Sequence, residues 1–348
     1  MTEVPTMKPA DPVCPACREV VYAGEEFCEA CGSRLGPDPV PARVPTRGGG
    51  RACAGCGADA VDADGYCERC GLKQPAPRDR VELEIAAGRA AGVSDRGRRH
   101  SRNEDYLALT EHPAGFATVV CDGVGSSPDP DRASLAAAET GGAALAERLA
   151  AGDDPADATR AALLRAGDAV AALAPSPAEA PSCTYVSAVT GPGTVTVGWV
   201  GDSRAYWLAA DGSVADGDGG DVLGPSRQLT ADDSWAAIMV ARGALTEAEA
   251  EAHPNAHVIT GWLGADAEQL DPHVRTFAVD RPGTVLVCSD GLWNYLPAAG
   301  GLAAVAGDAA AAPLDAARAL VRHALEAGGR DNITVTLLPV TAGNGAPA

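Results

Sequence analysis

The stretch TVVCDGVGSS, residues 118–127, sets an apolar run directly against Asp122 and Gly123. Apolar and β-branched residues favour a buried strand, and a glycine lets the backbone turn sharply where the strand ends. The same design returns in TVLVCSDGLWN (residues 284–294) and, more loosely, in TVGWVGDSRAYW (residues 196–207). We therefore expect three strands that each end at an aspartate beside a glycine.

The aspartates at these strand ends indicate a metal site. One aspartate in a turn is ordinary, but several converging carboxylates repel one another unless cations lie among them. Hard divalent ions that prefer oxygen ligands, Mg2+ or Mn2+, suit such a cluster. Two ions that share a carboxylate can activate water for attack on a phosphoryl group. The pattern favours metal-assisted hydrolysis, whereas each aspartate taken alone is compatible with a simple turn or a solvated strand end.

Strand-like runs follow one another in some parts of the sequence, and helical stretches follow one another in other parts. This segregation predicts an α+β fold with antiparallel sheets covered by helices. Strands are expected at 116–121, 183–190, 194–200, 205–209, 284–288 and 333–338. Stretches rich in alanine and leucine, with acidic starts, predict helices at 131–151, 154–174 and 314–327. Three cysteines lie in the strand runs, and we expect Cys121, Cys183 and Cys288 to be buried and structural.

Eight of the 11 cysteines lie before residue 71, in two sets with the spacing C-x2-C-x10-C-x2-C. Two CxxC turns point four thiolates at one ion, which suits tetrahedral Zn2+ and leaves no open coordination position. Disulfides are the alternative, and they would require an oxidising compartment. We predict two structural Zn2+ ions, because a module of about 20 residues cannot fold without one. The expected ligands are Cys14, Cys17, Cys28 and Cys31 for the first ion, and Cys53, Cys56, Cys67 and Cys70 for the second.

The predicted organisation is two small modules followed by one large domain. The first zinc ribbon is placed at residues 11–35 and the second at 51–73, with a Pro- and Gly-rich linker at 36–50 between them. A second linker at 74–83 leads into the large domain at 84–340.

The formal net charge of −20 argues against two kinds of partner. Nucleic-acid binding needs a basic face, and anionic membranes attract basic segments. No apolar window approaches the length of about 18 residues that a membrane span requires, and the first residues show no export signal. We therefore expect a cytoplasmic protein that binds neither nucleic acid nor membranes.

Eight motifs, in order across residues 84–340, resemble the protein phosphatase 2C-like family of metal-dependent Ser/Thr phosphatases. They are SDRGRRHSRNEDYLAL, VVCDGVGSS, CTYVSAV, VGWVGDSRAYWL, QLTADDS, HVITGWLG, VCSDGLWNYL and GRDNITVTLL. The resemblance implies a four-layer α-β-β-α sandwich of two antiparallel sheets flanked by helices, with a metal site at one end. It also implies hydrolysis of phosphoserine and phosphothreonine in proteins modified by Ser/Thr kinases, through water activated by two metal ions.

The resemblance also assigns roles to individual residues. Asp122 is expected to bridge two Mn2+ or Mg2+ ions, with Asp290 and Asp331 completing the first site. The carboxylate of Glu104 and the backbone carbonyl of Gly123 would bind the second ion, partly through water. The four carboxylates are the expected catalytic centre.

Substrate phosphate binding departs from the family pattern. His100 stands where the family places the arginine that holds phosphate, and it lies near Arg99 and Arg102. We expect one of these three residues to bind phosphate, since a guanidinium can hold two phosphate oxygens at once. The family histidine that donates a proton in some members is Val124 here, which leaves that role to water or to another residue.

A third metal ion is doubtful. By the resemblance it would use Asp202, Asp290 and the side chain at position 294, where Asn294 is a poorer ligand than an acid. The third ion should therefore bind weakly or not at all. Asp202 would then hold Arg204 or nearby backbone.

Two questions about partners stay open at this point. The resemblance makes residues 232–251 a flap that contacts protein substrates, whereas the sequence alone shows a helical patch with an acidic end. The zinc ribbons would recruit a protein partner or regulate the enzyme, or serve only as a spacer.

The alternative function is a catalytically inactive phosphatase fold that acts as an adaptor through its ribbons. The four retained carboxylates argue against it, while His100 and Asn294 keep it open.

Overall fold

The computed structural model describes residues 52–53, 56–62, 65–72, 74, 76–215, 220–267 and 270–341. The predicted first ribbon at 11–35, with its ligands Cys14, Cys17, Cys28 and Cys31, and the linker at 36–50 lie outside the described residues.

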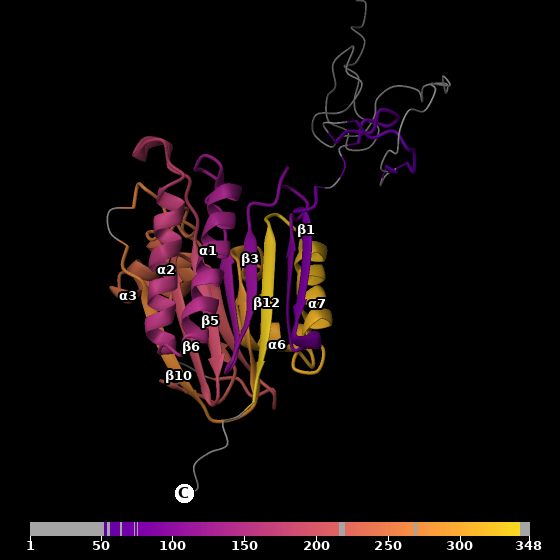
Figure 1. Cartoon of the computed structure of the whole chain (residues 1–348). Coiled ribbons are helices and arrows are strands. Elements are labelled where there is room, and N and C mark those ends of the chain that lie inside the picture. The colour runs from indigo at the N-terminus through magenta and orange to yellow at the C-terminus, as the bar shows by residue number, and fades with distance from the viewer. Residues whose placement is uncertain are drawn as a thin grey trace, which may run out of the picture. The chain divides into compact units, whose positions relative to one another are not determined.

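Two six-stranded sheets form the middle of the large domain (Figure 1). One sheet has the order β1-β2-β12-β11-β7-β9 and the other the order β3-β4-β5-β6-β10-β8. Neighbouring strands pair antiparallel, except that the short β8 runs parallel to β10. The strands are β1 (Arg80–Ile85), β2 (Ala90–Asp95), β3 (Tyr106–His112), β4 (Gly115–Cys121), β5 (Tyr185–Gly191), β6 (Thr194–Val200), β7 (Arg204–Ala209), β8 (Val222–Leu223), β9 (Arg227–Gln228), β10 (His273–Val279), β11 (Gly283–Cys288) and β12 (Ile333–Val340).

Helices cover the outer faces of both sheets and complete the predicted four layers (Figure 1). Helices α1 (Pro130–Ala150) and α2 (Pro155–Ala171) pack on the sheet that contains β4 and β6. Helices α6 (Ala299–Ala306) and α7 (Pro313–Ala327) pack on the sheet that contains β7 and β12. The Asp154 carboxylate caps α2 by accepting hydrogen bonds from the first-turn amides, which explains why that helix begins there.

The six predicted strands and three predicted helices are all present, with ends shifted by a few residues. The sequence showed them because strands such as β11 are buried at every position and consist mostly of apolar residues. Four longer strands were not predicted: β1, β2, β3 and β10. In β1, exposed and half-buried positions alternate, and β10 carries His273 and Arg275, so neither reads as a continuous apolar run.

Apolar side chains from both sheets fill the space between them. Trp207 is fully buried and Phe277 is 1% exposed in this inner core. Separate apolar clusters lie under α1 and α2 and under α6 and α7, and they bury Cys121, Cys183 and Cys288 completely, as predicted. Within the described residues, no helix is long and apolar enough to cross a bilayer.

Short helices follow the central strands. In the predicted flap at 232–251, α3 (Trp235–Ala241) and α4 (Glu247–Glu251) confirm the helical patch. The one-turn helix α5 (Asp290–Trp293) begins directly after β11.

Candidate active site

Five acidic residues lie at one end of the sandwich although they are far apart in the sequence. Each stands directly beside the end of a strand. They are Glu104 before β3, Asp122 after β4, Asp202 before β7, Asp290 after β11 and Asp331 before β12.

The strand register explains why these positions meet. In one sheet, Tyr106 at the start of β3 pairs with Cys121 at the end of β4. In the other sheet, Cys288 at the end of β11 lies between Arg204 of β7 and Val335 of β12. Because antiparallel neighbours reverse direction, strand starts and strand ends coincide at this edge of both sheets.

The Asp122 carboxyl group lies at the centre of this cluster. Its backbone is fixed by Thr184, whose Oγ1 accepts from the Asp122 amide at 3.1 Å and whose amide donates to the Asp122 carbonyl at 2.8 Å. Burial raises the pKa of Asp122 well above its ordinary value, and the negative charges of nearby carboxylates raise it further. The neighbours that act on it are Asp105, Asp290, Asp331 and Asp202.

Gly123 follows with a backbone that has no room for a side chain. A Cβ at this position would lie 2.6 Å from the carbonyl oxygen of Pro130. Its amide donates to the Glu104 carbonyl at 3.2 Å, which joins the two candidate ligands of the second ion. Glycine is therefore required by the close approach of the first turn of α1.

Asp290 is held at the first position of α5. Burial raises its pKa to about 7, and the charges of Asp331 and Asp105 act in the same direction. Asn294, one helical turn later, donates from Nδ2 to the Oδ2 atom of Asp290 at 3.1 Å. The side-chain amide of Asn294 thus occupies one carboxylate oxygen of Asp290. An acid at position 294 would leave that oxygen free to bind a cation.

Glu104 is positioned through its backbone by Asn332. The Oδ1 atom of Asn332 accepts from the Glu104 amide at 2.7 Å, and its Nδ2 atom donates to the Arg96 carbonyl at 2.7 Å. The Asn332 amide in turn donates to Asp331 Oδ1 at 2.8 Å. One buried asparagine therefore sets the relative positions of two predicted ligands.

Sequence reasoning missed Asp105, which is only 1% exposed. Its Oδ2 atom accepts hydrogen bonds from Ser289 Oγ and Thr334 Oγ1, both at 2.7 Å, while Oδ1 is buried without a partner among the described residues. Burial raises the pKa of Asp105 to about 7. The one signal in the sequence was its place between Glu104 and an apolar strand.

The three candidates for phosphate binding differ in their existing contacts. His100 Nε2 lies 3.1 Å from Asp331 Oδ1. Arg102 Nε lies 3.0 Å from Glu104 Oε1, and its Nη1 lies 3.2 Å from an oxygen of Asp131. Arg99 is exposed and forms no ion pair with any residue that the structure describes. Arg99 is thus the guanidinium of this group that is open to an incoming anion.

The sequence predicted that Asp202 would hold Arg204 or nearby backbone, and among the described residues no ion pair joins Asp202 to Arg204. Arg204 instead forms a two-pronged pair with Asp232, with Nε–Oδ1 and Nη2–Oδ2 distances of 2.9 and 2.7 Å. Its guanidinium lies 3.6 Å from the ring centroid of Trp293, whose Nε1 donates to the Asp202 carbonyl at 2.9 Å. Asp202 is 8% exposed, and burial followed by the charge of Asp290 raises its pKa to about 8. A buried guanidinium needs a two-pronged carboxylate, and Asp232 offers that geometry.

The oxygen donors of this cluster suit hard divalent cations. The unpartnered Oδ1 of Asp105 and the raised pKa values of Asp122 and Asp290 indicate that a cation placed among these carboxyl groups would offset their mutual repulsion. In the described part of the chain, only cysteines form a group of three or more ligand atoms that all lie within 4.8 Å of one another. Among the described residues, the carboxylates of the acidic cluster do not form such a group.

The second cysteine module is a compact thiolate site. Its four Sγ atoms lie within 4.8 Å of one another, with Cys53 and Cys67 buried. Gly57 and Gly71 follow Cys56 and Cys70 and have positive φ angles of 68° and 71°. Four sulfur ligands at this separation could hold one tetrahedral Zn2+.

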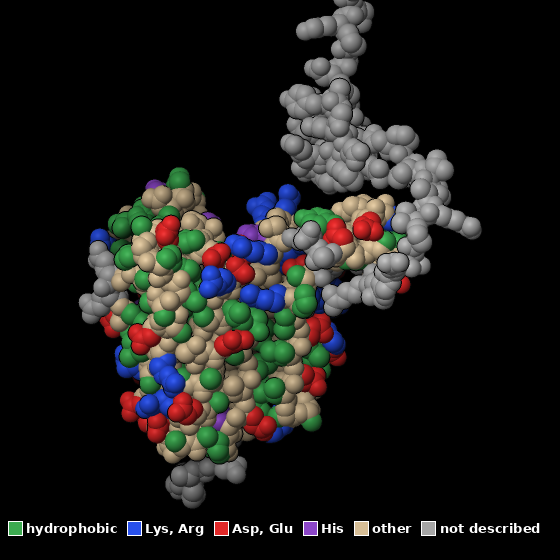
Figure 2. Space-filling model, turned by 45° about the horizontal axis from the view of Figure 1, so that its top comes forward, with side chains coloured by type: hydrophobic (Ala, Val, Ile, Leu, Met, Phe, Trp, Pro, Cys, Tyr) green, Lys and Arg blue, Asp and Glu red, His purple; other side chains and the backbone are tan. Residues whose placement is uncertain are grey.

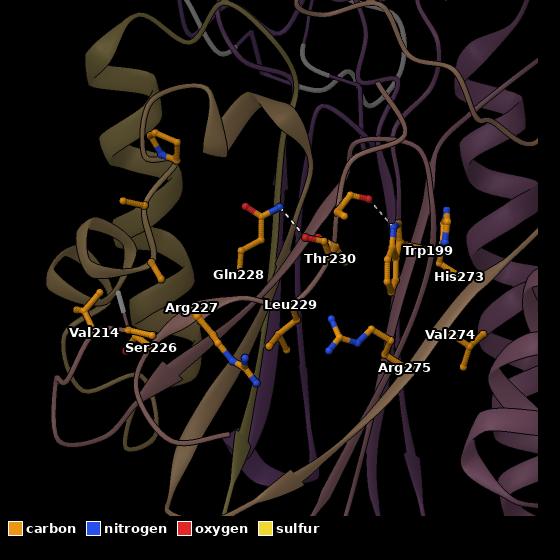
Figure 3. A pocket seen from close by; sticks show the side chains of 15 residues that line it. Trp199, Val214, Ser226, Arg227, Gln228, Leu229, Thr230, His273, Val274 and Arg275 are labelled. Carbon is orange, nitrogen blue, oxygen red and sulfur yellow. Dashed lines mark hydrogen bonds between the residues drawn. The ribbon is translucent and has the colours of Figure 1, made fainter. Parts of the chain in front are cut away.

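The end of the sandwich that carries the carboxylates comes forward in Figure 2, where basic and acidic side chains lie together beside a hollow. A separate cavity of about 780 Å3 is lined by 15 residues (Figure 3), none of which belongs to the acidic cluster. There Trp199 stacks on His273, donates to the Ala231 carbonyl at 2.7 Å, and lies near Arg275, which is paired with Asp221. Because this cavity contains none of the clustered carboxylates, the acidic cluster remains the candidate active site.

Two family models match this chain. The family model described as protein phosphatase 2C matches residues 94–326, and the model described as double zinc ribbon matches residues 14–71. The first match covers the strands that carry Asp122, Asp202 and Asp290 and ends before Asp331.

Individual relatives match parts of the chain. Protein phosphatase PhpP of Streptococcus pneumoniae is 38% identical over 111 residues, which cover 32% of this chain and 44% of PhpP. The chain therefore spans less than half the length of this curated relative. The structure of the Mycobacterium tuberculosis serine/threonine phosphatase PstP/Ppp superposes with a TM-score of 0.59 at 26% identity, covering 73% of this chain and 98% of that one. A structure of the PstP catalytic domain in complex with 2 manganese ions has a TM-score of 0.55 at 25% identity, covering 72% of this chain and 98% of that one.

Proposed function

Because the chain belongs to the protein phosphatase 2C family, we propose that it is a metal-dependent serine/threonine protein phosphatase. The observation that carries the proposal is the convergence of Glu104, Asp122, Asp290 and Asp331 at one end of the sandwich. Its substrates would be proteins that Ser/Thr kinases have phosphorylated, and two of its relatives are named as a protein phosphatase and a serine/threonine phosphatase.

The residues of the chain hold the reactants in place. Asp122, Asp290 and Asp331 would hold one cation, and Glu104, the Gly123 carbonyl and Asp122 a second one. Two Mn2+ or Mg2+ ions would offset the charge of the phosphoryl oxygens and lower the pKa of the attacking water. The cluster is pre-formed by strand register, so little rearrangement is needed when substrate arrives.

Binding of the substrate phosphate and protonation of the leaving group involve different parts of the site. Arg99, which is exposed and outside any ion pair with the described residues, would bind phosphoryl oxygens. His100 and Arg102 are already engaged by Asp331 and Glu104, so they would set the position of those ligands. Val124 cannot donate a proton, so the leaving oxygen would take one from water.

The zinc ribbons would act as a recruitment or regulatory module. Tyr66 and Leu72 in the second ribbon are 44% and 47% exposed, and they are the candidate contact residues for such a partner. Four sulfur ligands leave a zinc ion no open position for catalysis. A catalytically inactive adaptor is the less favoured alternative, since clustered carboxyl groups with raised pKa values destabilise a fold that has no use for cations.

The test is hydrolysis of p-nitrophenyl phosphate and of a phosphothreonine peptide by the full chain with Mn2+ or Mg2+. We expect turnover that EDTA abolishes and that Asp122→Asn lowers on the order of 10³-fold, because several kcal/mol of transition-state stabilisation are lost. Asp280→Asn, which changes an exposed carboxylate outside the cluster, is the matched control. Circular dichroism checks that each variant folds. Rates equal to buffer at all Mn2+ and Mg2+ concentrations would contradict the proposal and favour the adaptor.

A further inference from the structure

Two neighbouring cavities lie beside the acidic cluster. The first, of about 490 Å3, extends from the turn that begins at Val124 to Val258 in the segment that follows the flap. The second, of about 530 Å3, extends to Leu270. Trp262 and Asp266 line both cavities and form the wall between them.

This wall is built by specific contacts. The Oδ1 atom of Asp266 accepts from Trp262 Nε1 at 2.9 Å and from Ser182 Oγ at 3.3 Å. A Cβ on Gly264 would lie 2.5 Å from that Oδ1 and 2.8 Å from the Ser182 hydroxyl, so a glycine is needed for them to meet. The Oδ2 atom of Asp266 accepts no hydrogen bond from the residues that the structure describes, and the side chain is exposed.

The wall is tied to the acidic cluster through two short backbone bridges. Gly123 pairs with Cys183, and Cys183 pairs with Leu263, the residue after Trp262. The Val124 amide also donates to the Ser182 carbonyl at 2.9 Å. Leu263 therefore lies two neighbouring backbone segments from Gly123, about 10 Å at the usual spacing of paired strands, a distance that a few residues of extended peptide can span.

The charges of the two cavities favour a basic side chain. Their lining includes the carboxylates of Asp233, Asp266 and Asp271 and neither a lysine nor an arginine. Asp233 is already engaged, since Oδ2 accepts from the Gly201 amide and Oδ1 contacts His273 Nε2, both at 2.9 Å. Asp266 thus presents an open carboxylate oxygen directly beside an indole ring.

Apolar side chains that line the first cavity also fit the methylene stem of a lysine or arginine. Val258, which is 51% exposed, and Pro177 line the first cavity together with Trp262. Lysine and arginine combine a methylene stem with a charged head, so the stem can pack on these side chains while the head reaches a carboxylate. A flanking aspartate or glutamate would be repelled by the same carboxylates.

We propose that the wall formed by Trp262 and Asp266 binds a lysine or arginine side chain that flanks the phosphorylated residue of the substrate. The inference rests on the proposed phosphatase function and names the class of phosphoprotein that the site prefers. It makes Asp266 a specificity-determining residue, separate from the carboxylates of the acidic cluster.

The experiment places a single arginine at each position from three residues before to three after the phosphothreonine of an alanine-based peptide. For the full chain with Mn2+, we expect kcat/KM to rise about tenfold at one position or two neighbouring ones, relative to alanine. The ratio of arginine to alanine peptide should fall below about twofold in Asp266→Asn. Glu326→Gln, an exposed carboxylate on α7, should keep the full ratio.

Binding of the same labelled peptides, followed by fluorescence anisotropy, separates the two proposals because it does not depend on turnover. Tighter binding of the arginine peptide that Asp266→Asn abolishes supports the binding site, even if no hydrolysis occurs and the phosphatase proposal fails. The inference is overturned if arginine and alanine peptides bind and react alike at every position. It is also overturned if Asp266→Asn keeps the preference.

Discussion

The two candidate metal centres of this chain are assembled in opposite ways. The second zinc ribbon takes all its ligands from residues 53–70, and their Sγ atoms lie within 4.8 Å of one another. The acidic cluster draws its carboxylates from positions as distant as Glu104 and Asp331, which only strand pairing brings together. A local site depends on its ion to fold, whereas the distant site is formed by the fold and holds its charges against their mutual repulsion.

The largest expected effect tests the local site. Cys53→Ser should remove one bound zinc ion per chain, because three thiolates and a hydroxyl hold Zn2+ far more weakly than four thiolates. Zinc content of the purified full chain measures this directly. The main thermal unfolding transition, which reports the unfolding of the large sandwich, should shift by less than about 2 °C.

Substitution of the buried Cys288 to serine serves as the contrast. It should lower the temperature of that transition while zinc content stays the same. A large shift for Cys53→Ser would show that the two sites are not independent.

A second effect comes from pH and concerns the acidic cluster. The pKa values of Asp105 and Asp290 are raised to about 7 and that of Asp202 to about 8, from an ordinary 3.8. Between pH 4 and pH 8 the folded protein therefore binds more protons than the unfolded chain, so its stability falls as pH rises. The stabilisation from these three groups is fully present below pH 4 and is lost as pH rises through 7 to 8. With EDTA present, we expect the melting temperature at pH 8 to be roughly 5 °C below that at pH 5.5.

Added Mn2+ sharpens the same measurement. A cation held among the carboxylates favours their charged forms, so saturating Mn2+ should shrink or reverse the pH dependence. A melting temperature that rises with pH in EDTA would contradict the raised pKa values.

The smallest effect concerns Asn294. Asn294→Asp removes the 3.1 Å hydrogen bond to Asp290 and adds a negative charge beside it. Because position 294 is exposed, solvent screens the repulsion, and we expect the metal-free protein to lose roughly 0.5–1 kcal/mol of stability at pH 8. Mn2+ titration calorimetry should show an additional or tighter site in the variant. Asn255→Asp, an exposed asparagine in the flap region, is the matched control, and equal metal binding by both variants would count against a third site at Asp202 and Asp290.

The sequence by itself determined the local features of this protein. The cysteine spacing predicted the thiolate cluster because its ligands are close in the chain, and apolar runs predicted strands such as β11 because both of its faces are buried. The aspartate that follows each apolar run was also predicted, because it is adjacent to that run in the sequence. Family resemblance then supplied the order of the motifs.

Only the tertiary structure decided which side chains meet. The partner of Arg204 is Asp232 rather than Asp202, because a loop 28 residues away returns beside β7. Asp105 belongs to the cluster since Ser289 and Thr334 arrive from the other sheet. Trp262 and Asp266 meet over Gly264 and gain a place beside Gly123 through two backbone bridges. Contacts between distant segments depend on strand register and packing, and these are set by the whole fold rather than by any local pattern of residues.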